Sequence, residues 1–265
     1  MKLHTTLTKM TTYLDGDAHY ILPADHNFIK INPLIGKSID LQFIGEKYCA
    51  SCGDKHANLY RMGFCKNCFF TSPLAGESII NPELSTAHLD KADRDLDYEK
   101  SYQLQPHVVY LANSGGLKVG VTRASQKTTR WTDQGASEAI VLAQTENRYQ
   151  AGMIEVALKQ HLSDKTIWQK MLKNEDPELD LLKEKEAVKD KIPSEYQQWL
   201  SSEDEVYRIK YPVLEYPAKV KSLNLDKNSG LQSVLKGVRG QYLIFEGGIV
   251  LNIRSHTGYR VAITV

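Results

Sequence analysis

The chain has 265 residues, of which 42% are hydrophobic and 25% are charged, close to the average of globular proteins. A chain of this length can bury a sizeable core, which excludes wholesale disorder and a collagen-like or coiled-coil protein. Basic and acidic residues nearly balance at 33 and 32, so net charge alone indicates no polyanionic partner. No apolar run approaches the roughly 18 residues of a membrane helix, and no secretory signal is evident. We therefore expect a cytoplasmic protein with no membrane partner.

Residues 1–48 have the pattern of β-structure. The turn sequence Asp15-Gly16-Asp17 separates two short apolar runs, which is typical of a β-hairpin. Further on, Ile39, Leu41 and Phe43 alternate with polar residues, as in a strand that buries one face. The segment is therefore expected to be β-rich.

Residues 49–72 contain all four cysteines of the chain, Cys49, Cys52, Cys65 and Cys68, as two C-x2-C pairs twelve residues apart. Each pair on a tight turn supplies two corners of a tetrahedron, so the pattern predicts a zinc ribbon. Two disulfides or four buried free thiols are the alternatives, and disulfides are unfavourable in a protein without a signal peptide. Four thiolates leave no open coordination position, so this zinc is expected to be structural.

Residues 73–105 are polar and are expected to form a connector. Residues 106–163 show the clearest patterns of strands and helices in the sequence. Here the apolar run from His107 to Ala112 predicts a strand, a Gly-rich turn follows, and Leu117 to Thr122 predicts a second strand. Residues 138–144 fit a third strand or a helix, and residues 147–162 fit a helix. We expect a small mixed sheet flanked by helices.

The last 102 residues divide by charge. Residues 164–204 hold seven lysines and eleven acids and predict a solvated helical segment, to which we assign no function. Residues 205–265 are β-rich and basic, with nine Lys or Arg against four acids. The β-rich segments 1–48 and 205–265 are candidates for one domain into which the rest is inserted.

Two short sequences flank the Gly-rich turn of this region: Val108-Val109-Tyr110 before it and Lys118-Val119-Gly120-Val121-Thr122 after it. Together they resemble the core of the GIY-YIG nuclease superfamily, in its Lys-Ile-Gly-x-Thr branch. Arg130 and Glu155 follow in the order that the superfamily requires. The whole chain also resembles an uncharacterised bacterial family that combines a four-cysteine knuckle with this core. These resemblances imply an α+β protein with a GIY-YIG-like core, a zinc ribbon and β-rich terminal segments.

The superfamily resemblance implies metal-dependent hydrolysis of phosphodiester bonds. Glu155 would bind one Mg²⁺ or Mn²⁺, Tyr110 would act as general base or its helper, and Arg130 would neutralise the phosphate. Two signature positions differ: Val108 replaces a glycine, and Lys118 replaces a tyrosine. Lys118 remains a candidate catalytic residue, since a lysine can hold a phosphate. Taken singly, each residue also has an ordinary explanation, such as a core position for Tyr110 or a solvated helix face for Glu155.

Basic and amide side chains around this core and in the C-terminal segment are candidates for contacts with the substrate. They are Arg123, Lys127, Gln134, Arg148, Arg239 and Arg254. The first functional hypothesis is a nuclease acting on DNA or RNA. The alternatives are a zinc-ribbon protein that binds nucleic acid without cleaving it, and a protein-interaction scaffold.

Overall fold

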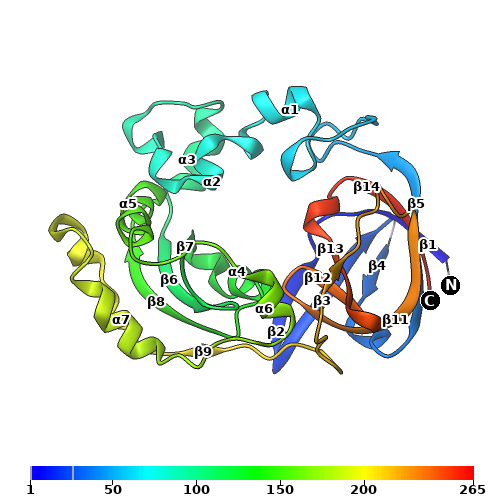
Figure 1. The fold of residues 1–265 in the computed structure, drawn as a ribbon. Coiled ribbons are helices and arrows are strands. Elements are labelled where there is room, and N and C mark those ends of the chain that lie inside the picture. Colours follow the sequence, from blue (N-terminus) through cyan, green and yellow to red (C-terminus); the bar gives the residue numbers. More distant parts are fainter. Residues whose placement is uncertain (1, 26) are drawn as a thin grey trace. The chain divides into compact units, whose positions relative to one another are not determined.

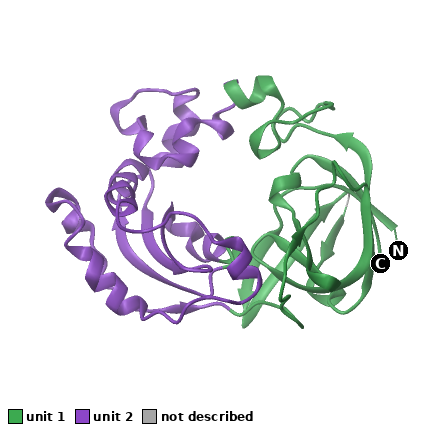
Figure 2. Ribbon diagram, viewed as in Figure 1, with its two compact units in different colours: residues 1–70, 132–135, 210–265 green, residues 71–131, 136–209 purple. Residues whose placement is uncertain are grey.

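A computed structural model describes residues 2–25 and 27–265, and the chain divides into two compact units (Figure 2). Unit 1 comprises residues up to Phe70, Thr132–Gly135 and Lys210–Val265. Unit 2 comprises Thr71–Trp131 and Ala136–Ile209. Helices and several sheets occur together, so the α+β fold class expected from the sequence is confirmed (Figure 1).

Unit 1 is built from a seven-stranded and a three-stranded sheet, with strand orders β1-β14-β5-β11-β12-β13-β10 and β2-β3-β4. All neighbouring strands pair antiparallel except β10 and β13. The strands are β1 (Lys2–Thr6), β2 (Thr11–Asp15), β3 (Asp17–Ala24), β4 (Asn27–Lys30), β5 (Ser38–Lys47), β10 (Lys221–Ser222), β11 (Gly230–Arg239), β12 (Tyr242–Phe245), β13 (Ile249–Asn252) and β14 (Tyr259–Thr264).

The two ends of the chain meet in the larger sheet of unit 1. Strand β14 lies between β1 and β5, with Leu3 opposite Ile263 on one side and Leu41 opposite Ile263 on the other. Ile39 and Leu41 are buried, as their alternation with polar residues predicts. The predicted hairpin at Gly16 is confirmed, because β2 and β3 pair across it and Gly16 adopts a φ of 69°.

A buried polar network holds residues 132–135 in unit 1. The side-chain amide of Gln241 donates to Asp133 Oδ1 (2.9 Å) and to the Met10 carbonyl (3.1 Å), and its oxygen accepts from the Met10 N–H (2.8 Å). Thr12 Oγ1 donates to the same Asp133 oxygen at 3.1 Å, and Lys9 pairs with the other one. Each of these buried groups therefore has a partner, as a stable interior requires.

Unit 2 contains one four-stranded sheet of order β7-β6-β8-β9. Every neighbouring pair is antiparallel where we expected a mixed sheet, because the chain passes from β7 through α4 and adds β8 at the far edge of β6. The elements are α2 (Glu77–Ile80), α3 (Leu96–Gln103), β6 (His107–Asn113), β7 (Leu117–Arg123), α4 (Lys127–Asp133, in this unit as far as Trp131), β8 (Glu138–Thr145), α5 (Arg148–Lys159), α6 (Trp168–Leu172), α7 (Leu181–Lys189) and β9 (Tyr207–Arg208).

The predicted hairpin of β6 and β7 is confirmed, with Tyr110 opposite Gly120 and Ala112 opposite Lys118. Gly115 in the turn has a φ of 74°, and a Cβ atom there would lie 2.4 Å from the Ile167 carbonyl oxygen, so only glycine fits. Residues 138–144 fall within a strand, which decides between the two sequence interpretations.

Helices α5 and α7 pack against the sheet of unit 2 (Figure 1). Ile154 and Leu158 of α5 join Val109, Leu111 and Val121 of the strands in one buried apolar cluster. In the part of the chain that the structure describes, no helix has the length and apolar character needed to cross a membrane.

The expected connector between ribbon and core is largely helical. Besides α2 and α3 it contains the 3-10 turn η4 (Pro82–Leu84), which packs on α5. A short helix α1 (Lys66–Thr71) closes the ribbon and begins directly after Cys65.

Candidate functional site

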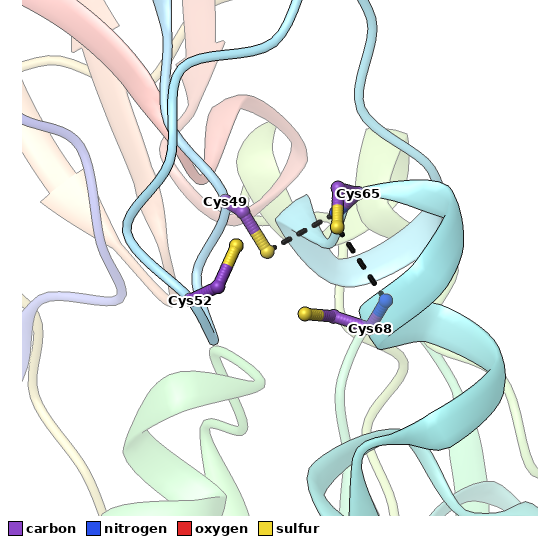
Figure 3. A group of neighbouring side chains, drawn as sticks. All are labelled: Cys49, Cys52, Cys65 and Cys68. Carbon is purple, nitrogen blue, oxygen red and sulfur yellow. Dashed lines mark hydrogen bonds between the residues drawn. The ribbon is translucent and has the colours of Figure 1, made fainter.

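The four cysteines gather at one point of unit 1 (Figure 3). Their sulfur atoms all lie within 4.8 Å of one another, and none of the four is in a disulfide. Cys49 follows β5, and Cys68 lies on α1. Gly53 and Gly63, beside the two cysteine pairs, have φ of 76° and 80°, as the tight turns require. The sequence therefore correctly identified a set of four potential metal ligands.

The environment of the sulfurs fits a metal-bound thiolate centre. Cys49 Sγ accepts hydrogen bonds from the backbone N–H groups of Cys65 (3.2 Å) and Ser51 (3.4 Å), and Cys65 Sγ accepts from Cys68 N–H (3.4 Å). Burial raises the pKa of the Cys49 thiol, but these hydrogen bonds outweigh burial and lower the pKa to about 6. The four cysteines are thus positioned to hold a metal ion, and sulfur donors of this number and type suit zinc.

The candidate catalytic residues come from β6, β7, α4 and α5 of unit 2. Tyr110 is fully buried in β6, and a Cβ atom at Gly120 would lie 2.5 Å from its hydroxyl oxygen. The phenol ring therefore occupies the space that any side chain at position 120 would take. Trp131 meets the Tyr110 ring edge to face at 5.9 Å.

Lys118 is the most unusual group of this site. Only 3% of the residue is exposed, and its ammonium group has no hydrogen bond or ion pair within residues 2–25 and 27–265. The pKa of Lys118 is lowered to about 8, chiefly by burial and also by the positive charge of Arg130, while Glu155 opposes both. Lys118 therefore lies within electrostatic reach of both Arg130 and Glu155.

Glu155 lies on α5 and is only 6% exposed. Its Oε2 atom is buried without a hydrogen bond, and the Lys159 ammonium lies 3.3 Å away as an ion-pair partner. Burial raises the pKa of Glu155, Lys159 opposes this shift, and the nearby carboxylate of Glu83 adds to it. Glu83 Oε2 is also buried without a hydrogen bond. Such oxygen atoms are suitable donors for a hard divalent cation.

Replacing Lys118 with methionine should stabilise the fold at pH 7. The folded-state pKa of about 8 lies below the ordinary 10.5, so burial disfavours the charged form by about 3 kcal/mol. Methionine keeps the unbranched stem and removes this cost. In the unfolded chain the lysine keeps its proton up to a higher pH than in the folded chain. The free energy of unfolding of wild type should therefore increase by this amount as pH rises from about 8 to 10.5, whereas that of the variant should not. Urea unfolding at several pH values measures the difference.

Lys183→Met is the matched control, because the Lys183 side chain is 85% exposed and its replacement should leave stability nearly unchanged. A loss of stability in the Lys118 variant at pH 7 would mean that attraction to Glu155 outweighs the burial of the charge.

Gly152 and Arg148 lie on the same face of α5 as Glu155, and the connector covers this face. A Cβ atom at Gly152 would lie 2.2 Å from the Glu83 backbone nitrogen, so the backbone of the connector approaches α5 closely at this glycine. Arg148 is buried and donates to the carbonyl oxygens of Ser78 and Ile79, both at 2.9 Å. Arg148 therefore holds the connector, whereas we had expected it to contact the substrate.

The other candidate binding residues are divided between the two units. In unit 2, Arg123 lies over the Tyr102 ring at 5.0 Å, and Lys127 pairs with Glu203 at 3.2 Å. In unit 1, Arg239 is only 1% exposed and donates to the Gly135 carbonyl at 3.0 Å, so burial contradicts the predicted substrate contact.

Gln134 and Arg254 also belong to unit 1. Gln134 was expected to contact the substrate beside the α/β core, but residues 132–135 belong to unit 1 and not to the unit that contains this core. Arg254 is exposed, in the turn that precedes β14.

Sequence reasoning did not single out Glu83 or Asp164. Glu83 acts on Glu155, and Asp164 acts on both Lys118 and Lys159, with its carboxylate 3.5 Å from the Lys159 ammonium. Glu83 comes from the connector, 72 positions before Glu155, and no motif marks it. Only the packing of η4 on α5 reveals it.

Comparison with known proteins assigns the chain to a family without assigning an activity. No curated protein and no solved structure matches it. A family model described as "Protein of unknown function (DUF2797)" matches residues 36–261, which include the four cysteines and the Tyr110, Lys118, Arg130 and Glu155 group. The chain therefore belongs to this family of uncharacterised proteins, DUF2797.

Proposed function

We propose that the protein is a zinc-containing, divalent-metal-dependent nuclease that hydrolyses phosphodiester bonds in DNA or RNA. The observation that supports this most is Lys118, a buried lysine without a hydrogen-bonding or ion-pairing partner among the described residues, beside Arg130 and Glu155. Retaining a buried charge costs stability, and such groups cluster at functional sites. The resemblance to the GIY-YIG core gives these residues their roles.

In this proposal Glu155 would hold Mg²⁺ or Mn²⁺, and the bound ion would supply Lewis-acid stabilisation of negative charge on the phosphate. Arg130 pairs with the phosphate and neutralises charge that develops in the transition state. Lys118, with a pKa lowered to about 8, exchanges a proton near neutral pH far more readily than an ordinary lysine. The hydroxyl group of Tyr110, which lies where a side chain at position 120 would be, orients the attacking water. The four cysteines hold zinc and take no part in the reaction.

A second candidate is a nucleic-acid-binding protein that does not cleave. The burial of both Tyr110 and Glu155 favours it, because a substrate must reach these groups. In the nuclease hypothesis, the segment Glu77–Leu84 has to open from the Glu155 face of α5 when substrate binds.

Single-turnover incubation of zinc-loaded protein with labelled DNA and RNA distinguishes the two candidates. The nuclease hypothesis predicts cleavage that requires added Mg²⁺ or Mn²⁺ and that falls about 100-fold or more in Arg130→Gln, because a transition-state charge partner is lost. Arg208→Gln is the control, since this arginine has a 76% exposed side chain in the same unit. Binding without cleavage of any substrate would establish the second candidate instead.

A further inference from the structure

A cavity of about 270 Å³ lies in unit 1, between the loop of the cysteine ribbon and the turn that precedes β14. The ribbon contributes Leu59–Gly63, and the turn contributes Arg254, Ser255 and Thr257. Tyr259 of β14 completes the lining. We call it the ribbon pocket.

The walls of the ribbon pocket are fixed by the backbone. Gly63 has a φ of 80°, and a Cβ atom there would lie 2.7 Å from Thr257 Cγ2, so the two loops touch at this point. Its carbonyl accepts a hydrogen bond from Ala50 N–H at 2.8 Å, within the first cysteine turn. The Tyr60 N–H donates to the Phe64 carbonyl, directly before Cys65. The cysteine centre therefore holds one wall of the pocket in place.

The charge of the pocket lining is entirely positive. Arg61 and Arg254 enter from opposite walls and are both exposed, and no carboxylate lines the pocket. The Arg61 guanidinium has no carboxylate partner within the described parts of the chain. Two guanidinium groups around one cavity suit a phosphate group, which they bind through parallel hydrogen bonds.

Aromatic rings continue the pocket along the ribbon surface. Tyr60 is 45% exposed and stacks on Phe69 with ring centroids 6.0 Å apart. Phe70 is 59% exposed and meets Phe69 edge to face at 5.2 Å. Large exposed aromatic rings beside a positive pocket are typical of surfaces on which unpaired bases stack.

We infer that the ribbon pocket binds single-stranded nucleic acid, with a phosphate between Arg61 and Arg254 and a base on Tyr60 or Phe70. Bases in a duplex are already stacked, so exposed rings favour a single strand. This inference rests on the nucleic-acid partner of the proposed function and deepens it, because it assigns the recognition of single strands to unit 1.

Fluorescence anisotropy of a labelled single-stranded oligonucleotide, titrated with the full zinc-loaded chain without added Mg²⁺, tests the inference. The double variant Arg61→Gln, Arg254→Gln should bind about tenfold or more weakly, and its log–log salt slope should be shallower by about 0.7, the value for one phosphate contact in a single strand. Phe70→Ser should weaken binding about tenfold with an unchanged salt slope, because it removes stacking and no charge.

The control Lys30→Gln, Lys37→Gln removes the same charge from exposed positions of unit 1 outside the pocket, and it should bind as wild type does. Zinc content identifies any variant whose ribbon is disturbed. Wild-type affinity in the arginine variant, or equal binding of duplex and single strand by wild type, would overturn the inference. Either result leaves the nuclease proposal intact, because that proposal fails only when added Mg²⁺ or Mn²⁺ produces no cleavage.

Discussion

Glu155→Gln is expected to reduce Mg²⁺- or Mn²⁺-dependent cleavage about 1,000-fold or more while leaving nucleic-acid binding nearly unchanged. Glutamine preserves the shape of the side chain but removes the charge that holds a hard divalent cation. The fold should tolerate the change, because burial already raises the pKa of Glu155 and so disfavours its charged form. Single-turnover rates and binding of uncleaved substrate, measured on the same preparations, separate the two effects.

The pH dependence of wild-type cleavage gives an independent check. A raised pKa means that Glu155 takes up a proton at a higher pH than an ordinary glutamate, so metal binding should weaken early as pH falls. Higher Mg²⁺ concentration should restore the rate at low pH, since the ion and the proton compete for one carboxylate.

Glu186→Gln is the matched control. Glu186 also pairs with a lysine on its own helix, Lys189, but its side chain is 65% exposed and lies on α7. Its substitution should leave the rate unchanged. If Glu155→Gln cleaves as fast as wild type, the activity comes from another site or from a contaminating enzyme.

Local sequence patterns predicted the hairpins and suggested that the two β-rich ends of the chain belong together, but they did not predict which distant strands pair. Tight hairpin turns depend only on neighbouring residues, so the turn sequences at Gly16 and in Ser114–Gly116 were sufficient to predict both hairpins. The pairing of β14 with both β1 and β5 joins residues more than 200 positions apart, and no local pattern encodes it. The place of residues 132–135 in unit 1 was unpredictable for the same reason, because it depends on a hydrogen bond between the distant residues Gln241 and Asp133.

The candidate site was predictable to the extent that its residues form a spaced motif. The cysteine pairs form such a motif, and the structure brings their four sulfur atoms together. Lys118, Arg130 and Glu155 follow one another in a motif order, and Lys118 lies within electrostatic reach of the other two. A single arginine outside a motif does not indicate whether it lies at a binding surface. Arg148 and Arg239 were both expected to contact substrate, but they are buried and donate to backbone carbonyl groups. Whether an arginine faces solvent or an internal carbonyl depends on tertiary packing.

Cys65→Ser is expected to abolish stoichiometric zinc binding and to unfold the ribbon. Wild-type protein should contain one zinc per chain, and structural zinc of this kind contributes about 10 kcal/mol or more to the folding of the segment that holds it. Cys65 is buried, its sulfur lies within 4.8 Å of the other three, and α1 begins directly after it. The β-sheets of unit 1 have their own apolar core and should persist. Elemental analysis measures the zinc, and limited proteolysis should reveal new cleavage between β5 and α1.

Two controls identify the ligands. Asn58→Ser changes an exposed residue of the same loop and should keep the metal. Cys52, Asp54 and His56 form a second group whose ligand atoms also lie within 4.8 Å of one another. Four sulfurs complete a tetrahedron without His56, so His56→Ala should retain one zinc per chain. Retention of zinc by Cys65→Ser together with its loss from His56→Ala would show that the mixed group binds the metal and would refute the four-cysteine centre.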